Sequence, residues 1–113
     1  MTPPASSMLY TLDEEGNPVH TGNVIAWSAW MASHDRRLAR DTVGAVEVST
    51  VFLGLDHGWG RGDPVLWETM QFGGGRDDRR MDRYTSRAAA LAGHAAWVER
   101  LKEKIEGPTE TAK

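Results

Sequence analysis

The segment Ala45–Leu55 (AVEVSTVFLGL) constrains the fold more than any other part of the sequence, because it has the pattern of one long strand. It is rich in Val, Thr and Phe, which favour extended backbone, and its apolar residues lack helical spacing. Side chains alternate along a strand, so one face carries Val46, Val48, Thr50 and Phe52, and the other carries Glu47, Ser49, Val51 and Leu53. Both faces become apolar toward the carboxyl end, so we expect that end to be covered on both sides.

Shorter strand patterns flank this segment, and glycine, proline and acidic residues separate them. We expect strands at residues 9–12, 19–20 and 65–72, a strand ending near Val43, and turns at residues 13–18 and at Gly44. Residues 56–64 (DHGWGRGDP) form a loop, because three glycines and a proline forbid regular structure. The glycines at 73–75 break the chain, and residues 76–83 are expected to form a charged, flexible connection.

Two segments have apolar residues at helical spacing. The first covers residues 23–33, follows Thr21 or Asn23 as N-cap, and places Val24, Trp27, Trp30 and Met31 on one side. Because this helix is short, its stability depends on packing its tryptophans. The second covers residues 86–105 after Thr85 or Ser86, with an apolar stripe of Ala90, Leu91, His94, Trp97, Val98, Leu101 and Ile105.

This order of elements predicts an α+β fold: a small antiparallel sheet of three to four strands, with a short Trp-rich helix and a long C-terminal helix packed on it. At 113 residues the chain has room for one core. We expect residues 1–7 to be a disordered N-terminal tail, residues 8–106 to be a single α+β domain, and residues 107–113 to be a polar C-terminal tail.

Composition excludes several classes of protein. The absence of cysteine rules out disulfides and thiolate metal sites and fits a reducing compartment. A net charge of −3 gives no positive field for nucleic acid, so we do not expect a nucleic-acid partner. No apolar run has the length of a membrane span and no secretory signal is visible, so we expect no membrane partner and a cytoplasmic location.

Part of the sequence resembles a known family. The resemblance rests on Val48–His57 (VSTVFLGLDH), on Pro64–Met70 (PVLWETM), and on the later Arg83-Tyr84-Thr85 and Gly93-His94. It extends from about Leu9 to Ile105. The family consists of short, uncharacterised proteins of phages and prophages, mainly those of actinobacteria. The resemblance implies a phage or prophage accessory protein in the cytoplasm of a bacterial host cell, and it carries over no catalytic residue.

The loop at residues 56–64 is the first candidate site. Trp59 lies among glycines with little local core to fill, so it either folds back over the sheet or is exposed for binding. Tryptophan and arginine are enriched where proteins bind one another, and Arg61 and Asp63 follow closely. These three residues predict a surface that binds a host or phage protein. A homodimer is compatible with exposed aromatic residues, although the sequence sets no symmetry.

Asp56, His57, Glu68 and His94 form the second candidate site. His94 lies on the apolar stripe of the last helix, where its ring needs a polar partner, and Glu68 in its strand is the expected one. Together the four residues could hold a divalent metal, although their spacing matches no metal motif and no cofactor is favoured. In the alternative interpretation Asp56 caps a turn, His57 is a solvated loop residue, and His94 and Glu68 form a buried structural pair.

The remaining motifs give little support for catalysis. Ser49 and Thr50 lie inside a strand and not in a nucleophile elbow. The arginines of residues 76–87 alternate with aspartates, which cancel most of their field. We therefore expect a non-enzymatic protein that binds a host or phage protein. The alternative is a protein that binds a metal or a small ligand such as a nucleotide or phosphate, for example to sequester a signalling molecule.

Overall fold

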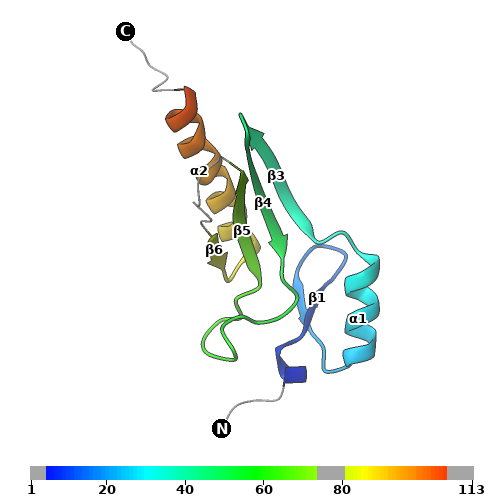
Figure 1. Cartoon of the computed structure of the whole chain (residues 1–113). Coiled ribbons are helices and arrows are strands. Elements are labelled where there is room, and N and C mark those ends of the chain that lie inside the picture. The colour runs from blue at the N-terminus through cyan, green and yellow to red at the C-terminus, as the bar shows by residue number, and fades with distance from the viewer. Residues whose placement is uncertain (1–4, 74–80, 107–113) are drawn as a thin grey trace.

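The computed structural model describes residues 5–73 and 81–106 and confirms the α+β class. Its centre is a four-stranded antiparallel sheet in the order β3-β4-β5-β6 (Figure 1). The strands are β3 (Arg37–Val43), β4 (Val46–Phe52), β5 (Trp67–Gly73) and β6 (Met81–Tyr84). The expected tails at residues 1–4 and 107–113 lie outside the described residues.

One long helix, α2 (Arg87–Glu106), packs along one face of this sheet (Figure 1). Val46, Val48, Thr50 and Phe52 of β4 all face α2 and are at most 6% exposed, as their alternation predicts. On the α2 side, Trp97, Val98 and Leu101 join Val43, Val46 and Val48 in one core cluster. A second cluster contains Phe52, Leu66, Trp67 and Ala90. The apolar stripe of α2 is thus the main cover of the sheet.

The N-terminal part of the chain forms a small layer beyond one end of the sheet. It comprises a 3-10 helix (Ala5–Met8), the hairpin of β1 (Tyr10–Leu12) and β2 (Pro18–His20), and α1 (Val24–Ser33). The hairpin joins the main sheet where Tyr10 N donates to Gly54 O at 2.9 Å and Leu9 pairs with Leu55. In Figure 1, α1 stands beside β1 at the same end of the molecule as the loop between β4 and β5.

Helix α1 is bound to this layer by one side. Asn23 caps it, with Asn23 Oδ1 accepting from Ala26 N at 3.0 Å, as the sequence predicts. Trp27 Nε1 donates to Gly54 O at 3.0 Å, and the Met31 side chain lies against the Cα of the same glycine. Gly54 has a φ of 76°, which places it in the left-handed region and explains why β4 ends at Phe52 and not at Leu55.

Four details of the prediction need correction. The expected connection at residues 76–83 contains strand β6 from Met81 to Tyr84, while residues 74–80 lie outside the described residues. The expected N-terminal tail includes the 3-10 helix from Ala5. Leu91 is 38% exposed and so does not belong to the buried stripe of α2. Val24 is 51% exposed, although it shares the side of α1 that carries Trp27 and Met31, because it stands in the first turn of the helix.

Candidate functional site

The loop between β4 and β5 is organised by one buried carboxylate. Asp56 is 2% exposed, and its side chain accepts hydrogen bonds from three backbone amides. Oδ1 accepts from Gly58 N at 2.7 Å and from Val65 N at 2.8 Å, and Oδ2 accepts from Gly60 N at 3.0 Å. These bonds join the beginning, the middle and the end of the loop. The alternative interpretation of Asp56, as a residue that caps a turn, therefore describes its geometry.

The electrostatics of Asp56 agree with this role. Burial is the largest influence on the Asp56 pKa and acts to raise it. The amides of Val65, Gly60 and Gly58, together with His57, act in the opposite direction and hold the pKa below the ordinary value for an aspartate. Both oxygens of Asp56 are thus committed to the loop backbone as a carboxylate. A metal ion would have to displace those amides in order to use them.

The ordered loop presents Trp59 to solvent. The Trp59 side chain is 53% exposed, and its backbone has a φ of 55°, the one positive φ of a non-glycine residue in the described part of the chain. A tryptophan in the left-handed region costs conformational energy, which the bonds to Asp56 offset. Such strain is concentrated at functional sites in proteins. The structure therefore resolves the two possibilities for this side chain: Trp59 is exposed and does not fold back over the sheet.

The other loop residues lie around Trp59. Arg61 and Asp63 are exposed, and neither side chain forms an ion pair within the described residues. Arg61 N donates to Gly58 O at 3.1 Å, so the loop backbone is fixed on both sides of the tryptophan. His57 is half-buried, and its amide donates to Val65 O at 3.0 Å. Trp59, Arg61 and Asp63 are thus three exposed residues of one ordered loop.

His94 is buried but its partners are not the expected ones. The ring is 4% exposed, with Nδ1 2.7 Å from Thr50 Oγ1 and Nε2 2.8 Å from Asp41 Oδ2. Thr50 Oγ1 also bonds the hydroxyl of Thr69. The sequence pattern placed Thr50 on the covered face of its strand and His94 on the covered stripe of its helix, so this contact was accessible to prediction.

Glu68 lies on the opposite face of the sheet, so the expected bond between His94 and Glu68 is wrong. Glu68 pairs across the sheet with Val51 and Arg83, whereas its neighbour Thr69 faces α2. Glu68 Oε2 accepts from Arg83 Nε at 3.0 Å, and the Glu68 side chain is 11% exposed. The arginine compensates the charge of this carboxylate, which gives Glu68 a structural partner of its own.

The four residues of the ligand hypothesis are therefore not assembled. Asp56 and His57 lie in the loop, Glu68 lies on the open face, and His94 lies under α2. Within residues 5–73 and 81–106 no group of three or more His, Asp or Glu residues is arranged to hold a metal ion. No described helix is long and apolar enough to cross a bilayer.

The order Asp41, His94, Thr50 resembles the acid, imidazole and hydroxyl of a hydrolytic triad, but it cannot act as one. Thr50 and Thr69 are 0% exposed, so no substrate carbonyl can reach either hydroxyl. The network instead gives the buried hydroxyls of Thr50 and Thr69 and the ring of His94 partners beneath the helix. We interpret it as part of the core.

A second exposed apolar surface lies on α1. The helix contains no charged residue; Ile25, on the side away from Trp27, is 82% exposed, and Val24 in the first turn is 51% exposed. An amphipathic surface helix normally carries its charges there. In Figure 1, α1 and the loop after β4 occupy the same end of the molecule. That end therefore carries two features of a protein-binding surface.

The chain matches no protein-family model, and neither curated proteins nor solved structures give a significant match.

Proposed function

We propose that this chain is a non-enzymatic accessory protein of a phage or prophage, which acts in the cytoplasm of a bacterial host and binds a host or phage protein through the loop of residues 56–65. One observation carries the proposal: a half-exposed tryptophan is held in a strained conformation by a buried aspartate that serves only the loop. Preorganised aromatic residues bind partners at a lower entropic cost than mobile ones. The phage origin rests on the family resemblance of the sequence.

Within this proposal each residue has a distinct role. Trp59 supplies the apolar anchor that enters a pocket of the partner. Arg61 and Asp63 each follow a glycine after Trp59. They supply charges of both signs at the rim and select the register of the partner. Asp56 acts through the backbone, because it holds the loop in the shape that presents Trp59.

A capture experiment tests this function. Tagged protein, expressed in an actinobacterial host with and without phage infection, is purified together with its partners, and these are identified by mass spectrometry. Trp59→Ala should lose a partner that the unmodified protein retains. Phe72→Ala is the matched control, because Phe72 is also an exposed aromatic residue, at 49%, but lies on the open face of the sheet. A partner that Trp59→Ala retains in full contradicts the proposal.

The uncharged outer side of α1 adds a second proposed contact. Its exposed isoleucine and valine lie at the end of the molecule that carries the loop, so one partner could cover both features. A homodimer formed through α1 is the simplest alternative occupant. Native mass spectrometry of wild type and Ile25→Glu distinguishes them: only a homodimer would dissociate in the variant without any partner present.

The metal-binding alternative receives no comparable support from the geometry, because its four residues are divided between a loop and two faces of a sheet.

A further inference from the structure

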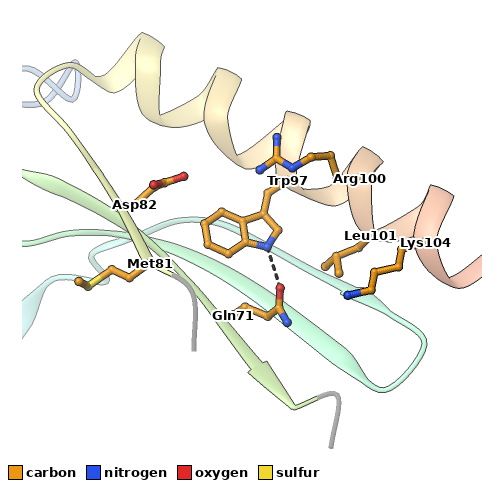
Figure 2. A pocket seen from close by; sticks show the side chains of 7 residues that line it. All are labelled: Gln71, Met81, Asp82, Trp97, Arg100, Leu101 and Lys104. Atoms are coloured by element: carbon orange, nitrogen blue, oxygen red, sulfur yellow. Dashed lines mark hydrogen bonds between the residues drawn. The ribbon is translucent and has the colours of Figure 1, made fainter. Parts of the chain in front are cut away.

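A cavity of about 450 Å³ lies between α2 and the edge of the sheet formed by β5 and β6 (Figure 2). Its described lining residues are Gln71 from β5, Met81 and Asp82 from β6, and Trp97, Arg100, Leu101 and Lys104 from α2. The volume falls within the range of about 300–1,000 Å³ that small-molecule sites occupy. None of these residues belongs to the loop of residues 56–65.

Two cations line this cavity without an anionic partner. Arg100 and Lys104 are four residues apart on α2 and therefore lie on the same side of the helix. Neither forms an ion pair within the described residues. Lys102 points elsewhere, and its Nζ lies 3.7 Å from Glu99 Oε2. The helix thus pairs the lysine outside the cavity, whereas the two cations inside it have no ion-pair partner among residues 5–73 and 81–106.

A third donor is fixed by a buried bond. Trp97 is 4% exposed, and its Nε1 donates to Gln71 Oε1 at 2.9 Å (Figure 2). The indole has only a donor, so the amide must present its oxygen to Trp97 and its NH2 group away from it. In Figure 2 that NH2 group and the Lys104 ammonium point toward the same end of the cavity. Donors without an acceptor converge there, which is the arrangement that an anion requires.

The other end of the cavity has the opposite character. Asp82 and the Arg100 guanidinium lie on one side of the Trp97 indole, and the Gln71 amide and the Lys104 ammonium lie on the other (Figure 2). Asp82 faces the same side of the sheet as Thr69, its cross-strand partner, and forms no ion pair within the described residues. Met81 and Leu101 supply apolar wall. Among the described lining residues, the cavity therefore has donors at the end of Gln71 and Lys104 and one carboxylate, Asp82, at the far end.

We propose that this cavity binds a small zwitterionic molecule that has a phosphate or carboxylate at one end and an amine at the other. The anionic group binds the Lys104 ammonium and the Gln71 amide, and the amine binds the Asp82 carboxylate. The molecule spans the Trp97 and Leu101 side chains between them. This site is independent of the Trp59 loop and of the function proposed for it.

Phosphoethanolamine, which has both charges, is the probe for the test, and titration of 15N-labelled protein is the measurement. The Trp97 indole N–H signal should move and saturate, because the probe binds the amide that accepts this bond. Ethanolamine and glycerol 3-phosphate, each lacking one charge, should bind at least tenfold more weakly. A parallel titration with 4-aminobutyrate decides between phosphate and carboxylate.

Substitutions locate the site. Lys104→Gln should weaken phosphoethanolamine binding at least tenfold, and Asp82→Asn should abolish the preference for phosphoethanolamine over glycerol 3-phosphate. Lys102→Gln is the matched control, because it removes the same charge from the same helix outside the cavity and should leave the affinity unchanged.

Two results would overturn the proposal: no saturable movement of the Trp97 signal with either zwitterion up to about 10 mM, or equal weakening by Lys102→Gln and Lys104→Gln. Trp59→Ala should bind phosphoethanolamine with the affinity of wild type. A failure of the proposed ligand site can therefore be told apart from a failure of the proposed protein-binding function.

Discussion

His94 and Asp41 are 53 residues apart in the chain, and His94 Nε2 lies 2.8 Å from Asp41 Oδ2. A carboxylate can only accept, so Nε2 donates to Asp41, and Nδ1 bonds the Thr50 hydroxyl. Thr50 Oγ1 also bonds the Thr69 hydroxyl. These hydrogen bonds join β5, β4, α2 and β3 in one network.

Replacing His94 should destabilise the fold. In His94→Ala the buried Thr50 hydroxyl loses its hydrogen bond to the imidazole, and a cavity forms beneath α2. We therefore expect the free energy of unfolding to fall by about 2–4 kcal/mol. Asp41→Asn should cost less than about 1 kcal/mol, because the Asp41 side chain is 55% exposed. Urea denaturation of both variants checks this order. An unchanged free energy of unfolding in His94→Ala would show that the network is not part of the core.

Replacing Asp56 should destabilise the loop in a pH-dependent way. Asp56→Ala leaves three loop amides without their acceptor, so we expect a loss of about 2–4 kcal/mol at pH 7. Asp63→Ala, at an exposed position of the same loop, should stay within about 0.5 kcal/mol of wild type.

The pH dependence follows from the lowered pKa of Asp56. The unfolded carboxyl has an ordinary pKa of about 3.9, and the folded one has a lower pKa. The stabilisation is thus fully present above the unfolded pKa and is lost as the pH falls through the folded pKa. The difference between wild type and Asp56→Ala in urea should shrink over that acidic interval. A difference that stays constant below pH 4 would contradict the assignment.

Glycine at position 59 should separate conformation from binding. Trp59 has a φ of 55°, which glycine adopts without strain, so Trp59→Gly should be as stable as wild type or up to about 1 kcal/mol more stable. Trp59→Val should be less stable than Trp59→Gly by more than about 1 kcal/mol, because a β-branched residue is unfavourable at positive φ. Thermal unfolding measures both. Both variants should lose the partner, which would show that the indole, and not the loop shape alone, is recognised.

The sequence predicted those parts of the fold that depend on local periodicity. The alternation of β4 placed Thr50 on the covered face, and the helical spacing placed His94 opposite it. Glu68 shows the limit of this reasoning. Met70 and Phe72 share its face and are apolar, which suggested that this face is the core. The side that faces α2 depends on the register between β4 and β5, and a shift of one residue reverses it.

Other differences also have non-local causes. Strand β6 has two apolar residues, Met81 and Tyr84, in a charged segment, and it is held by backbone pairing to β5 at the edge of the sheet. Helix α1 has the apolar spacing of a core helix, but it packs only through Trp27 and Met31 near Gly54 and through Trp30 against Phe52, so Ile25 on its other side stays exposed. For the candidate site, the sequence identified Trp59 correctly as a surface residue. It gave no indication of the cavity beside Trp97, which three separate elements create.

The close contact between Gly93 and Tyr84 gives a final prediction. A Cβ at position 93 would lie 2.6 Å from Tyr84 Cζ, so the tyrosine ring packs directly on the backbone of α2. The Tyr84 hydroxyl is buried and has no hydrogen-bond partner within the described residues. Gly93→Ala should therefore lower the free energy of unfolding by about 1–3 kcal/mol, although alanine in a helix normally adds about 1 kcal/mol of stability.

A double-mutant cycle with Tyr84→Phe tests the contact. Tyr84→Phe alone should be neutral or stabilising by up to about 1 kcal/mol, since it removes an unpaired buried hydroxyl. In the Gly93→Ala background, Tyr84→Phe should recover part of the lost stability, because it removes the hydroxyl that overlaps with the added methyl. The recovery is partial, because the ring carbons of residue 84 still overlap with that methyl. We expect a coupling energy of at least about 0.5 kcal/mol from urea denaturation. Additive effects would mean that α2 shifts to relieve the overlap and that this contact does not set its distance from the sheet.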